Sequence, residues 1–212
     1  MRSLTQEARQ SQSRAISTKK FVLVALLFHF GMREESDLRD YYAAYREDRY
    51  SFLYEPMRRA MSAMGNAMWS FAAIKEHTWY SGYAALTRAI HALEHKQPEY
   101  IDQFKDIMAK LGLPLSYPSI PEMRDSFSSA EEVLDKCISL IDDVNDGLSE
   151  VIEVCDNANF EPLARYAENV QMENYQDRQW LCEAKAMAGN GEMSSTSFDN
   201  WLNRTLNVPQ KE

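Results

Sequence analysis

The sequence predicts an all-α protein whose core is a bundle of four helices, and three observations predict it. Only seven glycines and seven prolines occur in 212 residues, and helix-forming side chains dominate the rest. Apolar residues recur at steps of three and four within four segments of roughly 25 residues each, which is the period of an amphipathic helix. A very short turn separates the last two segments, as expected for neighbouring helices of a bundle.

Residues 1–50 are predicted to lie outside the bundle, as a flexible tail followed by a short helical extension. Residues 1–20 carry five basic side chains against one acid, Glu7, and hardly any large apolar residue. The tyrosine-rich residues 35–50 have the pattern of a short amphipathic helix. Between them, the apolar run from Phe21 to Phe30 is about half the length of a membrane span, and no cleavage signal follows it. We therefore expect no membrane segment.

The bundle itself is predicted over residues 51–190. Its first helix starts close to Pro56 and carries a methionine-rich stripe, which we interpret as adaptable core packing rather than a metal site. The stripe comprises Leu53, Met57, Met61, Met64, Met68 and Phe71. The first helix ends at Ser81-Gly82, and the second ends at Gly112, a predicted C-terminal cap.

The third predicted helix has the cleanest apolar period in the chain. Ser128 and Ser129, followed by two glutamates, indicate its start. After a tight turn at 157–159, a fourth helix runs from about Glu161 to Met187. The remaining parts are a long proline-bearing connection over 112–126 and a polar C-terminal tail, 191–212, with a last short apolar piece from Phe198 to Leu206.

Charge, cysteine content and missing motifs exclude several kinds of protein. The net charge of −9 argues against a whole surface that binds nucleic acid, because phosphates require clustered Lys and Arg. The three cysteines show no CxxC spacing, so we expect neither disulfides nor a zinc knuckle, and a reducing, cytoplasmic location. No glycine-rich phosphate loop and no G-x-S-x-G elbow occurs, which argues against nucleotide binding and triad hydrolysis.

The second helix carries the most informative set of side chains. His91 and His95 are four residues apart, so they share one helix face and can bind a single metal ion. Asp102 and Asp106 have the same spacing, and each follows one of the histidines by eleven residues, almost a whole number of turns. Imidazole with carboxylate suits iron, with zinc or manganese as alternatives. The sequence therefore predicts metal ligands at these four positions, to which His77 adds a further imidazole.

Two alternatives stay open for this set of residues. The four side chains can instead form the solvated face of an exposed helix, with Arg88 and Lys96 among their neighbours. Pro98 can either kink a continuous helix or begin a new one. In the second case the histidine pair and the aspartate pair point in different directions.

The fourth helix offers a second pair of acids, Glu173 and Asp177, in register with its apolar stripe. Acids on the inward face of a bundle can be metal ligands, but the paired Glu-x-x-His motifs of the di-iron carboxylate class are absent from this chain. We interpret the two acids as partners in a buried salt bridge in preference to metal ligands.

Four motifs between residues 53 and 188 occur in an order that resembles one protein family. They are Ile74-Lys75-Glu76-His77-Thr78-Trp79, then His91, then Asp102-x-x-x-Asp106 with Leu111-Gly112, and finally the acidic stretch from Glu173 to Trp180-Leu181. Together they are similar to the motifs of the Dps-type miniferritins, which belong to the ferritin-like superfamily. The chain departs from that pattern where Thr78 splits the His-Trp pair, where Asp106 stands for a glutamate, and where Pro98 enters the helix.

The resemblance implies a ferritin-like four-helix bundle that assembles into a hollow homo-oligomer, a dodecamer in that family. It implies a ferroxidase that oxidises ferrous iron, usually with peroxide, and protects cells from oxidative stress. The iron would bind between subunits, with His77 from one subunit and with His91, Asp102 and Asp106 from its neighbour. His95 takes the place of an aspartate in one of two possible alignments. Residues 1–20 would correspond to the DNA-binding arm that some members carry.

Two other functions compete with iron oxidation. A catalytically inactive ferritin-like scaffold would keep the bundle and assemble through the tyrosine-rich segment without binding metal; Pro98 and the missing Glu-x-x-His motif favour it. DNA condensation through residues 1–20 would require many tails to act together, because the rest of the chain is acidic.

Overall fold

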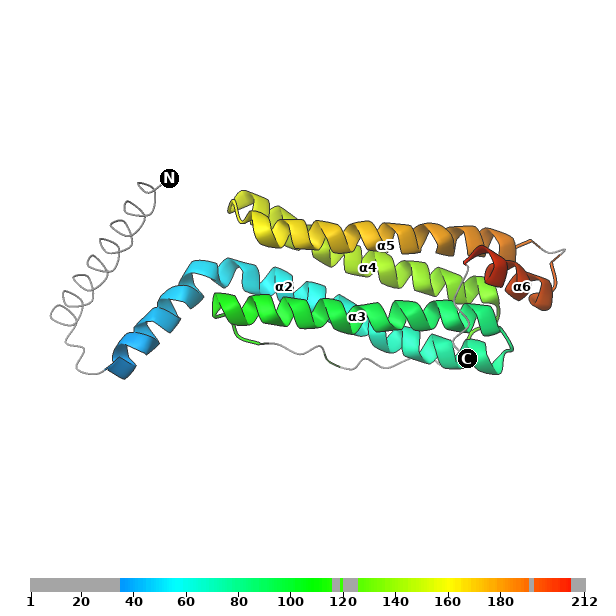
Figure 1. Ribbon diagram of the computed structural model, residues 1–212, viewed down its shortest axis with the longest axis horizontal. Coiled ribbons are helices and arrows are strands. Elements are labelled where there is room, and N and C mark those ends of the chain that lie inside the picture. Colours follow the sequence, from blue (N-terminus) through cyan, green and yellow to red (C-terminus); the bar gives the residue numbers. More distant parts are fainter. Residues whose placement is uncertain (1–34, 116–118, 120–125, 191–192, 207–212) are drawn as a thin grey trace, which may run out of the picture. The chain divides into compact units, whose positions relative to one another are not determined.

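The chain is all-helical in the part that the structure describes, as the sequence predicts. The structure is a computed structural model that describes residues 35–115, 119, 126–190 and 193–206, with side chains from Tyr50 onward. Its helices are α2 (Glu35–Tyr80), α3 (Ala84–Leu111), α4 (Ala130–Asn157), α5 (Glu161–Ala188) and α6 (Ser195–Thr205), shown in Figure 1. No strand occurs in these described ranges, and none of their helices is long and apolar enough to cross a bilayer.

The chain divides into two units, Met1–Asp48 and Arg49–Glu212. The second unit contains the bundle, together with α6. The predicted basic tail over 1–20 and the apolar run from Phe21 to Phe30 lie outside the described residues.

Ion pairs between the long helices establish their order around the bundle. They are Lys75–Glu94 between α2 and α3, Arg59–Glu150 between α2 and α4, Lys96–Asp177 between α3 and α5, and Arg178–Asp142 between α4 and α5. Neighbouring helices are antiparallel, so α3 and α4 are diagonal partners that run in the same direction. The connection between them must therefore return along the length of the bundle, which explains why it is long. A single long crossover of this kind is the topology of ferritin-like bundles.

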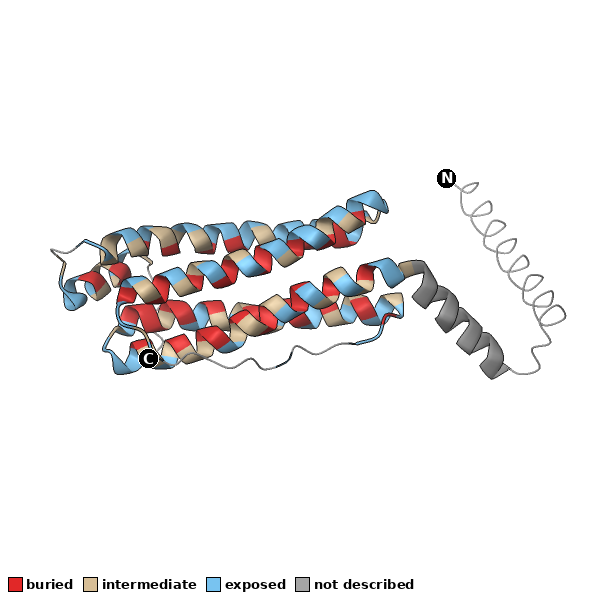
Figure 2. Cartoon of the chain, turned by 180° about the vertical axis from the view of Figure 1, so that it is seen from behind, coloured by how far each residue is buried: buried red, intermediate tan, exposed pale blue. Residues whose placement is uncertain are grey.

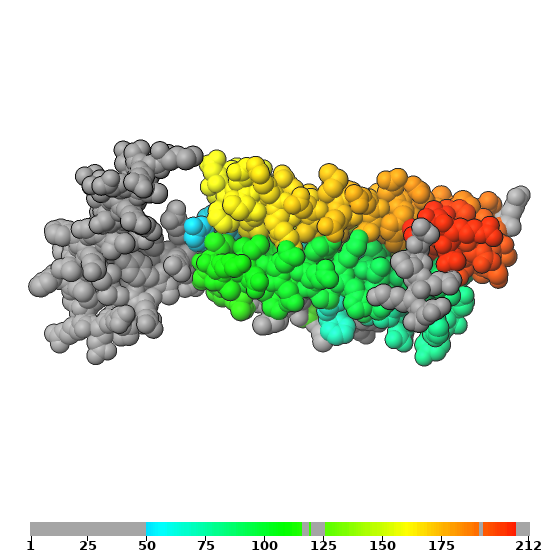
Figure 3. All heavy atoms as spheres, viewed as in Figure 1, coloured from blue at the N-terminus to red at the C-terminus, as the bar shows by residue number. Residues whose placement is uncertain are grey.

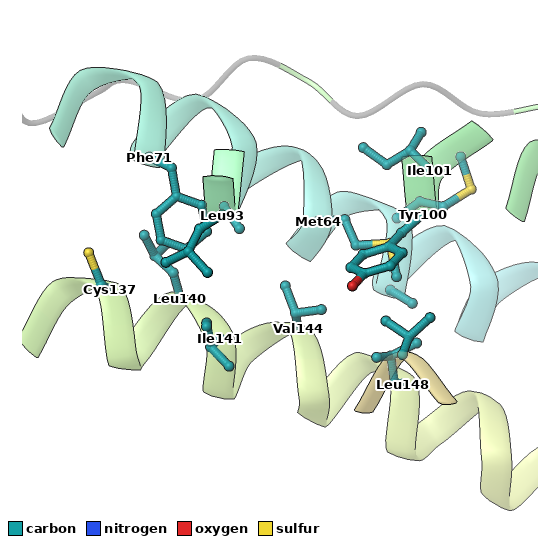
Figure 4. Close-up of a cluster of buried hydrophobic side chains, with 14 of the residues drawn as sticks. Met64, Phe71, Leu93, Tyr100, Ile101, Cys137, Leu140, Ile141, Val144 and Leu148 are labelled. Carbon is teal, nitrogen blue, oxygen red and sulfur yellow. The ribbon is translucent and has the colours of Figure 1, made fainter. Parts of the chain in front are cut away.

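The inward faces of the four long helices form one apolar core. Figure 2 shows buried residues along the faces that the helices turn toward one another, with exposed residues outside. The predicted methionine stripe of α2 belongs to this core: Met57, Met61 and Met64 are at most 1% exposed. In Figure 4, Met64, Phe71 and Leu93 lie opposite Leu140, Ile141 and Val144 of α4. The core-packing interpretation of the methionines is confirmed.

Both internal prolines lie inside continuous helices. Pro56 is within α2, so the predicted helix start beside it is wrong. Pro98 is within α3, so this helix does not restart there. A proline removes one backbone hydrogen bond, but buried side chains on both sides of it hold the helix to the core. Leu53 and Met57 flank Pro56 at 0% exposure, and Leu93 and Ile101 flank Pro98 at 2% and 7%.

The helix ends follow the predicted capping chemistry. The Ser129 hydroxyl accepts a hydrogen bond from the Glu132 backbone N–H, while the Glu132 carboxylate accepts from the Ser128 N–H and hydroxyl. Gly112 adopts the left-handed conformation with φ 73° and donates its N–H to the last turn of α3. The cap predicted at Gly112 and the helix start predicted at Ser128-Ser129 are both confirmed.

The segment expected as a C-terminal tail contains α6, which packs on the start of α3. Phe198 and Leu202 are buried at 2% and 1% exposure. The Asp199 carboxylate accepts hydrogen bonds from the backbone N–H groups of Ala85, at 2.8 Å, and Leu86, at 3.2 Å. These donors have no partner within α3, and a negative charge at a helix N-terminus is also favourable. The side chain of Tyr83, the N-cap residue of α3, makes no capping hydrogen bond. A residue of α6 therefore caps α3 instead.

A small residue allows α2 and α4 to approach closely. A Cβ atom placed on Gly147 of α4 would lie 2.9 Å from the Ala60 Cα of α2. Because that neighbour is backbone, the two helices would have to separate to admit even a methyl group.

We expect Gly147→Ala to lower the free energy of unfolding by about 1–2 kcal/mol, because the forced separation outweighs the gain of about 1 kcal/mol in helix propensity. Urea denaturation measures this change. Ser139→Ala, at an exposed position of the same helix, is the control and should change stability by less than about 0.5 kcal/mol. A Gly147→Ala protein as stable as the parent would contradict the close approach.

Asp199→Ala should destabilise the protein by about 1–2 kcal/mol, because the first N–H groups of α3 lose their acceptor. Asp199→Asn keeps an oxygen acceptor and should cost less. Thermal denaturation followed by circular dichroism tests the order wild type, Asn, Ala. Equal melting temperatures for the three proteins would show that α6 does not cap α3.

Candidate functional site

The two histidines of α3 stand together on the outside of the bundle. Their ring centroids are 4.3 Å apart and their planes are nearly perpendicular, at 83°. Both residues are exposed. The spacing of four residues therefore places His91 and His95 on one face, as the sequence predicts, and that face points away from the core.

Glu94 connects this pair to α2. Its carboxylate lies 3.1 Å from His91 Nδ1 and accepts a hydrogen bond of 2.7 Å from the Lys75 ammonium. Burial by itself would raise the pKa of Glu94, but the hydrogen bonds from Lys75 and His91 outweigh it and hold this pKa below its usual value. Glu94 is therefore an ionised carboxylate that orients the His91 ring. Sequence reasoning missed it, although it stands three residues after His91, within reach on a helix.

The aspartate pair lies on the same helix but too far along it to join the histidines at one ion. His95 and Asp102 are seven residues apart, which is about 10 Å at 1.5 Å per residue, whereas metal–ligand bonds are about 2 Å long. Asp102 is 72% exposed at its side chain and pairs with Lys105 at 2.8 Å. Asp106 is also exposed. Within the described part of one chain, no three His, Cys, Asp or Glu side chains are grouped to hold a metal ion.

His77, near the end of α2, has different neighbours from the histidine pair of α3. Its ring packs edge-on against Phe127, with centroids 5.3 Å apart, and its Nε2 is 3.4 Å from the Ser81 hydroxyl. It borders a hollow of about 210 Å³ formed with the start of α4. His77 and His91 border different hollows of one chain, so a site that contains both would take His77 from a second chain.

His91 borders a larger hollow, of about 450 Å³, between the end of α2 and the start of α3. Its lining combines aromatic and charged side chains: Lys75, Glu76, Trp79, Tyr80, Thr87, Arg88 and His91. Trp79 and Tyr80 are 66% and 84% exposed, respectively, which is unusual for aromatic side chains. The histidine pair therefore stands at the edge of an exposed aromatic surface.

The acids of α5 are engaged by α3. Asp177 accepts a hydrogen bond of 2.6 Å from the Lys96 ammonium, and Glu173 accepts one of 2.7 Å from the Tyr100 hydroxyl. Burial, and then the hydrogen bond to Glu173, raise the pKa of Tyr100, so this hydroxyl stays protonated. The salt-bridge interpretation is confirmed for Asp177, while Glu173 pairs with a neutral tyrosine. Figure 3 shows the face formed by α3 and α5, with α6 at one end.

The middle of the bundle holds amides where a carboxylate metal centre would need acids. Metal sites inside four-helix bundles use carboxylates and imidazoles from facing helices. Here the buried polar side chains include Gln97, Asn145 and Asn174, and the Asn174 amide donates to Asn145 Oδ1 at 2.9 Å. Among the described residues, Gln97 Oε1 and Asn145 Nδ2 have no hydrogen-bond partner. The buried acid of this set, Asp177, is already neutralised by Lys96. Neutral amides cannot balance the charge of buried divalent ions, so the described interior does not fit a dinuclear centre.

The buried thiols do not supply ligands either. Burial raises the pKa of Cys137 to about 12 and that of Cys155 to about 11. Both side chains are 0% exposed, so a metal ion does not reach them from the surface. The ligand-type side chains available to a metal are therefore on the outer surface.

Replacing Lys96 with methionine should lower the free energy of unfolding by about 2 kcal/mol, because the Asp177 carboxylate, 12% exposed, loses its partner. The value is below that of a fully buried pair because Lys96 is 34% exposed and screened by water. Adding Asp177→Leu to Lys96→Met should restore most of the loss. A double-mutant cycle in urea measures this coupling, and additive effects would contradict it.

Solved structures similar to this chain include ferritins, although neither a protein-family model nor a curated protein matches the sequence. An open pore ferritin from the archaeon Archaeoglobus fulgidus has a TM-score of 0.63 at 10% identity, over 71% of this chain and 93% of that one. The M. penetrans ferritin has a TM-score of 0.65 at 13% identity, over 72% and 94%. A PmFTN variant soaked in iron has a TM-score of 0.65 at 12% identity, over 71% and 96%. At such identities the likeness concerns the fold: the chain has the four-helix bundle of the ferritins.

Proposed function

We propose that this protein is a homo-oligomer that binds ferrous iron at sites shared between subunits and oxidises it, as Dps-type miniferritins do. The observation that carries the proposal is the outward-facing pair of His91 and His95 beside an exposed aromatic surface. Since the described bundle interior offers one buried acid, Asp177, which Lys96 already pairs with, iron would bind on the outer surface, where a second subunit can complete the ligand set. Iron is the substrate here, and one similar structure was soaked in iron.

Each ligand residue has a defined part in this proposal. His91 and His95 of one subunit would bind one iron ion through imidazole nitrogen, and Asp102 and Asp106, about 10 Å further along α3, would bind a separate iron ion through carboxylate oxygen. His77, which does not reach His91 within one chain, would come from the neighbouring subunit. The dodecameric state, peroxide as the oxidant, the role in oxidative stress and a cytoplasmic location are parts of the same proposal. The three free cysteines agree with a reducing compartment.

The decisive experiment combines particle mass with iron oxidation. We expect a large oligomer by light scattering, and a ferric absorbance after ferrous iron and peroxide are added that His91→Ala and Asp102→Asn reduce at least tenfold. Asp143→Asn, at an exposed acid of α4, is the matched control and should oxidise iron like the parent. A monodisperse monomer, or oxidation that the His91 and Asp102 variants leave unchanged, would refute the proposal.

A second candidate function is a ferritin-fold scaffold that binds no metal. Two observations favour it: Asp102 is already paired with Lys105, and the described part of one subunit groups no three metal-ligating side chains. Such a protein would assemble into oligomers or partner complexes through its tyrosine-rich segment, and elemental analysis of the purified protein would find no metal. DNA binding through residues 1–20 concerns residues outside the described part, and it stays a prediction that deletion of the tail would test.

A further inference from the structure

We propose that His91 and His95 form a clamp on a single helix for a late first-row divalent cation of the copper or zinc type. Glu94 is the positioning residue that holds the His91 ring. This inference goes beyond iron oxidation, because the clamp needs neither the aspartates of α3 nor a second subunit.

The geometry of the pair suits one small cation. Nitrogen atoms bound to the same zinc-like ion lie about 3 Å apart, since each metal–nitrogen bond is about 2 Å. Two rings with centroids 4.3 Å apart, on a spacing of four residues, reach that separation through side-chain rotation alone. Both rings are exposed, so the ion can enter without opening the bundle.

The surroundings of His91 match the outer partners of known metal-binding histidines. Such histidines usually donate one ring N–H to a carboxylate, which orients the ring and leaves the other nitrogen free to bind metal. Glu94 lies 3.1 Å from His91 Nδ1, and Lys75 holds its carboxylate from the other side at 2.7 Å. Glu94 is only 20% exposed and His91 is 51% exposed, so the carboxylate lies behind the ring and the ring faces water.

The ligand chemistry selects the class of cation. Two imidazoles suit copper, zinc and nickel, whereas magnesium, calcium and manganese prefer oxygen ligands. The nearest aspartate on this strip, Asp102, is about 10 Å away by helix rise and is paired with Lys105. Water would complete the coordination sphere of the ion.

The experiment is calorimetric titration of the full chain with Cu²⁺ and with Zn²⁺. We expect a site that His91→Ala or His95→Ala abolishes and that Glu94→Gln weakens by about 10- to 100-fold. His77→Ala is the matched control, because it removes a histidine that is partly buried on another side of α2, and it should leave this site unchanged. Asp102→Asn should also leave it unchanged, although it impairs iron oxidation under the proposed function.

Two further readouts separate the clamp from a structural effect. Paramagnetic resonance of the Cu²⁺ complex should show two nitrogen ligands in the parent, and this signal should be lost in each histidine variant. Without metal, the melting temperatures of His91→Ala, His95→Ala and the parent should agree within a few degrees, because both side chains are exposed. Loss of the site in His77→Ala or Asp102→Asn, equal binding of Mg²⁺, or full binding by the His91 variant would each overturn the clamp.

Discussion

The structure depends on α3 remaining one helix across its internal proline. A proline inside a helix costs about 3 kcal/mol, because a hydrogen bond is lost and the ring crowds the preceding turn. Leu93, Ile101 and Phe104 lie on both sides of Pro98 and are almost fully buried. Each contributes about 1.5–3 kcal/mol by leaving water, which together exceeds the cost of the proline. Lys96 and Tyr100, on the two sides of Pro98, both contact α5, through Asp177 and Glu173 respectively.

Because α3 is continuous, its two faces carry different kinds of side chain along the whole helix. The inward face supplies core side chains together with Gln97 and Tyr100, and the outward face carries the histidine pair and the aspartate pair. The inward polar groups are already engaged or neutral: Tyr100 donates to Glu173, and the amides of Asn145 and Asn174 bond to each other. The His and Asp side chains of α3 that are free of the core therefore lie on its outer surface, where the described part of one chain groups no three metal ligands.

The end of the bundle where α2 meets α3 carries several features beyond the four long helices. There α6 caps α3 through Asp199, and the exposed aromatic pair Trp79 and Tyr80 forms one wall of the hollow beside His91. Glu94 and Lys75 join α2 to α3 next to that hollow. These contacts keep the histidine pair on a rigid helix, which the proposed metal clamp requires.

The sequence alone determined the helical class, the bundle, most helix ends and the shared face of the two histidines. These properties follow from local periodicity and capping, which depend on residues a few positions apart. Only the tertiary structure decided that α2 continues through Pro56 and that a residue of α6 caps α3. It also decided that Asp177 of α5 pairs with Lys96 of α3, and that Lys75 of α2 holds the Glu94 carboxylate beside His91. The continuity of α2 depends on core burial that outweighs the local preference of proline, and the other features are contacts between different helices. The residue spacing within a single segment encodes neither kind of feature.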